Sequence, residues 1–118
     1  MPALCFEYTN NLPIAEKIKS FLTETHPIVA DILSIDLSLC RSNVRCHTDF
    51  VIGDGAKHHA FIQLTIEIMP GRDNDTKSKL GKTLRCMIRK HFEEEIKGKS
   101  TQLRVYLIEV EPDLYYTG

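Results

Sequence analysis

The chain has 118 residues, 42% hydrophobic and 26% charged, which is typical of a globular domain and unlike a disordered segment. Fifteen basic residues against sixteen acidic ones leave a net charge of -1, so no basic surplus favours nucleic acid as a partner. No stretch approaches the ~18 consecutive apolar residues of a membrane span, and no secretory signal precedes the first strand-like segment. We therefore expect a single domain over residues 1–118, located in the cytoplasm, with neither membrane nor nucleic acid as a partner.

The first third of the chain predicts a strand followed by a helix. Apolar residues occupy every second position from Leu4 to Tyr8, which predicts a strand that starts at or just after Pro2. Apolar residues at helical spacing then predict a helix from about residue 13 to residue 25. Pro27 disfavours helical geometry at the residue before it, so it either kinks this helix or starts a second, short one.

The middle of the chain predicts two more strands. Alternation from residue 37 to about residue 52 indicates a long strand with one charged face, and alternation resumes from residue 58 to residue 68. Gly53-Asp54-Gly55, between them, has the composition of a tight turn. We therefore predict that these two strands form an antiparallel hairpin.

The last third predicts a second helix and a fourth strand. Asp73 or Asn74 can cap a helix whose apolar residues repeat at helical spacing until Gly98, and residues 103–107 alternate again. The order strand-helix-strand, repeated twice, predicts an α+β fold. Right-handed crossovers place both helices on one face of a four-stranded sheet. The uncovered second face predicts a homo-oligomer.

Pro2 is the first candidate for chemistry. When Met1 is removed, Pro2 carries a secondary amine at the head of a strand, and an ordinary α-amino group has a pKa of about 7.7–8.0. Burial or nearby cations such as Arg41 and Arg72 lower that pKa and make the amine a usable general base. Both arginines could also bind a substrate carboxylate through paired hydrogen bonds. The alternative is structural: Pro2 opens a strand, and the arginines form ion pairs at the surface or at a contact between subunits.

A set of residues spread over nearly the whole chain resembles the 5-carboxymethyl-2-hydroxymuconate isomerase family of the tautomerase superfamily. That resemblance implies a tautomerase-like fold of duplicated β-α-β units in a mixed four-stranded sheet, assembled as a homotrimer. It also implies an isomerase without cofactor or metal. The residues that carry it are Pro2, Asn11, Pro27, Arg41-Ser42, Asp54-Gly55, Ala60-Phe61, Gly71-Arg72, Gly81 and His91-Phe92.

The resemblance also implies a reaction from the breakdown of aromatic compounds. Pro2 would be the general base that moves a proton in 5-carboxymethyl-2-hydroxymuconate, or a similar 2-hydroxy-dienoate, to give the 2-oxo isomer. Arg41 and Arg72 would bind the substrate carboxylates and stabilise the developing negative charge. The chain departs from the family at Ala3, Cys46 and Phe50, where members have His or Trp. Two alternatives therefore stay open: a tautomerase of another 2-oxo acid, and a non-catalytic trimeric binding protein that keeps Met1.

Overall fold

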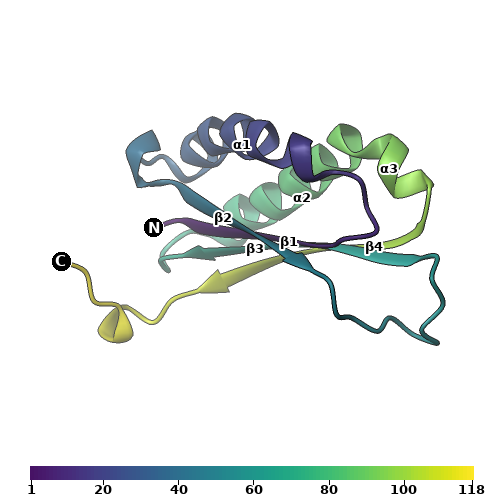
Figure 1. Cartoon of the computed structure of the whole chain (residues 1–118). Helices are drawn as coiled ribbons and strands as arrows, with labels where there is room; N and C mark the ends of the chain where they lie inside the picture. The colour runs from purple at the N-terminus through teal and green to yellow at the C-terminus, as the bar shows by residue number, and fades with distance from the viewer.

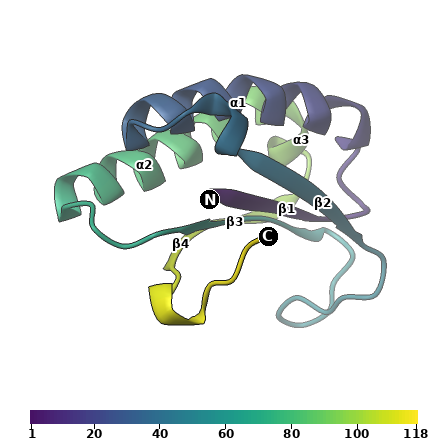
Figure 2. The same cartoon turned by 90° about the vertical axis from the view of Figure 1, so that its left-hand side faces the viewer.

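The computed structural model describes residues 1–118 as a four-stranded sheet with its helices gathered on one face (Figure 1). The view turned by 90° shows the same two layers, with the C-terminal segment and the loop between the second and third strands, but no long helix, on the other side of the sheet (Figure 2). The strands are β1 (Ala3–Thr9), β2 (Arg41–His47), β3 (His59–Ile68) and β4 (Ser100–Glu109). The helices are α1 (Ile18–Leu33), α2 (Asn74–His91) and α3 (Glu93–Lys97).

The sheet has the strand order β2-β1-β3-β4 and is mixed. Strands β1 and β2 are parallel, as are β3 and β4, whereas β1 and β3 are antiparallel. Each half of the chain is thus a strand-helix-strand unit whose helix crosses over the sheet. The predicted α+β fold, with duplicated β-α-β units and both long helices on one face, is confirmed.

The predicted hairpin between the second and third strands is wrong. Strand β1 lies between β2 and β3 and pairs with both, so residues 48–58 form a connection that passes the end of β1. The bend itself is present, because Gly53 and Gly55 adopt positive φ angles of 55° and 81°. A turn sequence shows only where the chain bends, and the pairing depends on which strand offers a free edge.

The second strand is also shorter than the predicted span of residues 37–52. The Asp36 side chain accepts a hydrogen bond from the Ser38 backbone N–H at 2.9 Å and holds residues Leu37–Leu39 in a 3-10 turn. At the other end, β2 stops at His47, opposite Thr9, where its partner β1 also stops. Alternation alone cannot extend a strand past the end of its hydrogen-bonding partner.

The first helix starts later and runs further than predicted. A 3-10 turn over Ala15–Lys17 precedes α1, and α1 continues through Pro27 to Leu33 without a second start. Buried apolar residues on both sides of Pro27, such as Phe21 and Val29, pack on the same core. This tertiary packing outweighs the single backbone hydrogen bond that proline removes.

The second helix is interrupted where one helix was predicted. Asp73 caps α2 as expected, since its carboxylate accepts a hydrogen bond from the Thr76 backbone N–H at 2.8 Å. Phe92 leaves helical geometry, with φ -112° and ψ 26°, and separates α2 from α3. Its fully buried ring packs against Phe6 and Phe21 at centroid distances of 5.6 and 5.2 Å. The break lets a short α3 follow the sheet toward β4 while Phe92 stays in the core.

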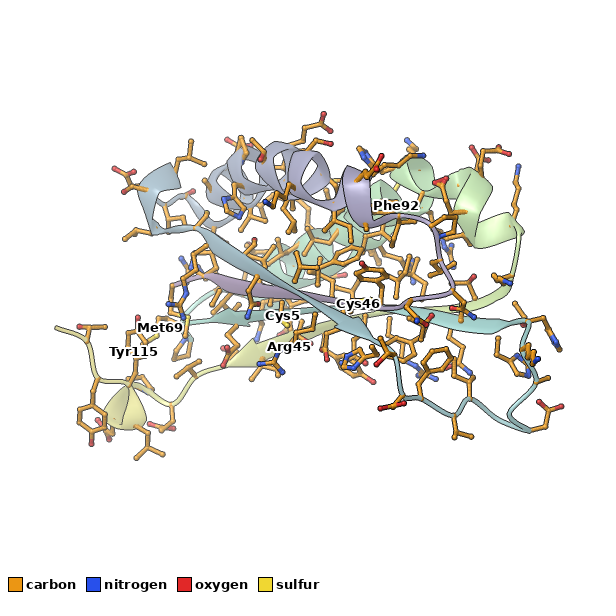
Figure 3. The ribbon with its side chains drawn as sticks, in the orientation of Figure 1. Cys5, Arg45, Cys46, Met69, Phe92 and Tyr115 are labelled. Atoms are coloured by element: carbon orange, nitrogen blue, oxygen red, sulfur yellow. The ribbon has the colours of Figure 1, made fainter.

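The two faces of the sheet differ sharply in composition. Even-numbered residues of β1 and β3 point at the helices and belong to a core of 21 buried residues. We call the other side the open face; it carries the odd-numbered residues of β1, β2 and β3 and the even-numbered residues of β4. In Figure 3, Phe92 lies between the helices and the sheet, while Arg45 lies on the open face.

Candidate active site

Pro2 lies at one end of the sheet, next to the start of β2. It is buried, and its carbonyl oxygen accepts a hydrogen bond from the Arg41 backbone N–H at 3.2 Å. The next residue, Ala3, stands opposite Arg41 on β2 and Glu67 on β3. The fold thus brings the N-terminus beside the start of one strand and the end of another. In the 118-residue chain the Pro2 nitrogen is bonded to Met1 and is an amide.

Arg41 is the first residue of β2 and is exposed on the open face. Its side chain forms neither a salt bridge nor a hydrogen bond within the chain. The surface ion pair considered as an alternative for Arg41 is therefore absent from this chain. All five N–H donors of its guanidinium remain free for an anionic group.

Arg72 follows β3 at the same end of the sheet, and its guanidinium is anchored. It donates hydrogen bonds to the carbonyl oxygens of Met69 and Leu33, both at 3.2 Å. Leu33 is the last residue of α1, where backbone carbonyls carry a partial negative charge that a cation stabilises. Arg72 therefore holds the end of α1 against the sheet. These two bonds leave about three of its N–H donors for another partner.

A hollow of about 440 Å³ lies on the open face, lined by Ala3, the residue after Pro2. Its walls are polar, with Arg41 and Arg45 of β2 on one side and Thr65 and Glu67 of β3 on the other. Cys5 of β1 lies between them. Two unpaired guanidinium groups in one hollow favour a ligand with carboxylates, since arginine binds carboxylates in a bidentate manner.

The cysteines near this hollow are poor candidates for a catalytic base. Burial raises the pKa of the Cys5 thiol, the charge of Glu7 raises it further, and Arg45 opposes them. Burial also raises the pKa of Cys40, while the N-terminal amino group lowers it. Both groups are held as neutral thiols, so a base at this end of the sheet has to come from another residue.

The structure adds Arg45 and Glu67 to the residues singled out from the sequence. Arg45 was detectable, because it lies at a spacing of four from Arg41 on a strand and so shares its face. Glu67 was not detectable, since its position depends on the register between β1 and β3. No group of three or more His, Cys, Asp or Glu side chains is placed to hold a metal ion. None of the helices combines the length and the apolar composition needed to cross a bilayer.

The family comparison matches the chain almost from end to end. The model of the family described as 5-carboxymethyl-2-hydroxymuconate isomerase covers residues 2–117. The chain belongs to the 5-carboxymethyl-2-hydroxymuconate isomerase family. It is therefore an isomerase of the tautomerase superfamily, and the resemblance stated from the sequence is confirmed. No curated protein sequence matches the chain.

Solved structures agree with this family's fold. A 5-carboxymethyl-2-hydroxymuconate isomerase from Deinococcus radiodurans R1 is 22% identical, with a TM-score of 0.85 over 99% of this chain and 88% of that chain. A 5-carboxymethyl-2-hydroxymuconate delta-isomerase is 16% identical, with a TM-score of 0.82 over 100% and 87%. A fused 4-OT wild-type symmetric trimer is 18% identical, with a TM-score of 0.70 over 92% and 85%. At these identities the likeness establishes the tautomerase-like fold.

Proposed function

We propose that this isomerase, once Met1 is removed, moves a proton in 5-carboxymethyl-2-hydroxymuconate or a similar 2-hydroxy-dienoate to give the 2-oxo isomer. The observation that carries the proposal is the place of Pro2, buried at the end of the sheet and hydrogen-bonded to the backbone of Arg41. The unpaired guanidinium of Arg41, the residue that makes this contact, supports a substrate that carries a carboxylate. The reaction needs no cofactor, because it relocates one proton and transfers no electrons.

Pro2 is the general base in this proposal. Its secondary amine takes the proton of the substrate's 2-hydroxyl group and returns it to a carbon of the conjugated chain. The enol C–O bond becomes a carbonyl as electron pairs move along the conjugated double bonds to the carbon that receives the proton. The substrate and product therefore have the same atoms. Arg41 and Arg72 lie at this end of the sheet, and a nearby cation disfavours the protonated form of an amine.

Arg41 and Arg72 bind the substrate in this proposal. Arg41 offers an unpaired guanidinium to one carboxylate, and Arg72 offers the donors that its bonds to Met69 and Leu33 leave free. Negative charge that develops on the 2-oxygen during proton transfer is stabilised by such preorganised donors. Because Arg72 also anchors α1, its removal affects both stability and catalysis. Urea denaturation and steady-state kinetics on Arg72→Lys measure the two roles separately, since lysine keeps the charge but loses the paired donors that both roles use.

The assembly and location extend the proposal. We propose a homotrimer, because the open face leaves half of the sheet uncovered and a chain of similar fold is described as a symmetric trimer. The expected location is the cytoplasm, and cell fractionation tests it. The oligomeric state is measured by sedimentation equilibrium, where a monomer would contradict the proposal.

The test combines intact mass with ultraviolet absorbance, since the dienol and the ketone absorb differently. We expect protein that lacks Met1 to ketonise 5-carboxymethyl-2-hydroxymuconate. Activity should scale with the processed fraction, because the amide nitrogen of unprocessed Pro2 is not basic. Processed protein that acts only on another 2-oxo acid would overturn the substrate assignment. Processed protein that is inert toward the whole panel but binds the acids would instead identify a binding protein.

A further inference from the structure

Helix α2 concentrates positive charge that the net charge of the chain conceals. The chain has a net charge of -1, yet α2 carries six basic residues and a single acidic one, Asp75. Of the six, only Lys77 forms a salt bridge, with Glu109 at 3.0 Å. Like charges one helical turn apart repel, so an anion bound beside them stabilises the helix. The basic residues are Lys77, Lys79, Lys82, Arg85, Arg89 and Lys90.

A groove of about 380 Å³ lies between α2 and β4. Ser78, Lys82 and Arg85 line it from α2, and their spacing of four and three residues places them on one face of the helix. Arg104 borders it from β4, an edge strand of the sheet. No Asp or Glu lines the groove, and none of its three cations has an ion-pair partner. The groove therefore holds positive charge without a counter-charge.

Gly81 brings the two walls of the groove close together. It lines the groove from α2, and a Cβ at this position would lie 3.4 Å from the Leu107 side chain of β4. The absence of a side chain at Gly81 thus lets α2 lie close to β4. Leu103 and Val105, half-buried on β4, add apolar surface to the same groove. Its volume falls within the roughly 300–1,000 Å³ that is typical of small-molecule sites.

The donors of this groove suit a phosphate group better than a carboxylate. A carboxylate is bound well by the planar fork of one arginine, whereas here a lysine, two arginines and a serine hydroxyl come from two elements. A phosphate group has three strong acceptor oxygens and a charge of roughly -1.5 to -2, so it can accept hydrogen bonds from several directions. The hollow on the open face differs, because its cations are arginines alone and Glu67 lies among them.

We propose that the groove between α2 and β4 binds the phosphate group of a small organic phosphate. Lys82 and Arg85 neutralise the phosphate from α2, the Ser78 hydroxyl donates a hydrogen bond, and Arg104 reaches it from β4. The apolar residues of β4 contact the carbon part of the ligand. This site is separate from the hollow on the open face, with which it shares no residue.

The first test locates the bound anion by nuclear magnetic resonance. Phenyl phosphate is titrated into the isotope-labelled full-length protein, and the backbone amide shifts are followed. We expect saturable shifts at Ser78 and Gly81. Phthalate, which carries the same ring and two carboxylates, should bind at least about 3-fold more weakly. Equal affinities would overturn the phosphate assignment, and shifts centred on Arg41 and Arg45 would place the anion in the hollow and overturn the site.

The second test removes single cations. Lys82→Ala and Arg85→Ala should each raise the Kd for phenyl phosphate by about 3-fold to 10-fold, since each loses one charged hydrogen bond at an exposed site. Arg85→Lys should recover part of the affinity, because the charge is kept. Lys57→Ala is the matched control: it loses the same charge from the loop between β2 and β3 and should bind like wild type. An equal loss in Lys57→Ala would overturn the proposal, because net charge and not the groove would then govern binding.

This inference goes beyond the proposed reaction, and the two fail separately. Arg85→Ala should ketonise the substrate at the wild-type rate, whereas Arg41→Ala should bind phenyl phosphate with wild-type affinity. If the protein is inert toward every 2-oxo acid but phenyl phosphate binds in the groove, the groove stands and the proposed reaction is wrong. If the protein is active and phenyl phosphate causes no shifts at Ser78 and Gly81, the reaction stands and the groove proposal is wrong.

Discussion

The two faces of the sheet are built for different purposes. On the helix side, Phe6 and Leu64 are fully buried, and the face closes within one chain. On the open face, Arg41 and Arg45 are exposed, carry no ion-pair partner, and line a hollow together with Ala3. The comparison shows that most of the buried apolar area lies on one face of the sheet, which leaves the other face free to carry unpaired charges.

Pro2→Ala should produce the largest change in activity, and it tests the proposed site without altering the core on the helix side. Met1 is still removed before alanine, so the variant keeps an amine but loses the rigid secondary one. We expect kcat to fall by about 10²–10⁴-fold, the usual contribution of a positioned general base. The measurement is ultraviolet absorbance during ketonisation, with intact mass to verify processing. Wild-type turnover in the processed variant would rule out Pro2 as the base.

Phe92→Ala is the matched disruption of the helix face. The ring is fully buried and packs on Phe6 and Phe21, so its removal leaves a cavity and should lower the free energy of unfolding by about 3–5 kcal/mol. Urea denaturation measures this change. Gln102→Ala, exposed on the open face of β4, is the control and should stay within about 0.5 kcal/mol. Equal losses in the free energy of unfolding at Phe92 and Gln102 would contradict the conclusion that the helix side of the sheet supplies most of the stability.

Arg41→Ala tests whether the unpaired cation serves the reaction. We expect kcat to drop by about 10²–10³-fold, as for the loss of one preorganised donor, with little change in the free energy of unfolding. Steady-state kinetics and urea denaturation on the same preparation separate the two effects. Arg89→Ala, exposed on α2 and away from the open face, should keep wild-type kinetics. A variant at Arg41 that unfolds more easily but turns over normally would assign it a structural role.

The smallest expected effect is acid sensitivity at the cap of α2. The Thr76 backbone N–H and then the Thr76 side chain hold the pKa of Asp73 below its ordinary value. A lowered folded-state pKa stabilises the protein above the unfolded value of about 3.9, and this contribution disappears as pH falls through the folded pKa. Asp73→Asn should therefore show a shallower loss of Tm on acidification below about pH 4, measured by circular dichroism. Asp75→Asn, in the same helical turn but without the capping hydrogen bond, should behave like wild type.

Local patterns predicted the elements, and long-range pairing decided their ends. The alternation at Leu4, Phe6 and Tyr8 reflects a strand with one buried face, and it needs no knowledge of the rest of the chain. The predicted second strand failed at both ends, because its length is set by β1. The hairpin prediction failed for the same reason. The turn at Gly53 was predicted to pair β2 with β3, but β1 pairs with that edge of β3.

The candidate site also combines features that the sequence predicts with features that only the structure shows. Pro2 at the head of a strand, and Arg41 with Arg45 on one side of another, follow from the order of residues and the two-residue period of a strand. Contacts between residues far apart in the chain decide the rest. They bring Pro2 to Arg41, Arg72 to the end of α1, and Glu67 into the hollow. Periodicity is a property of neighbouring residues, whereas register and packing minimise the free energy of the whole chain, so only the tertiary structure determines them.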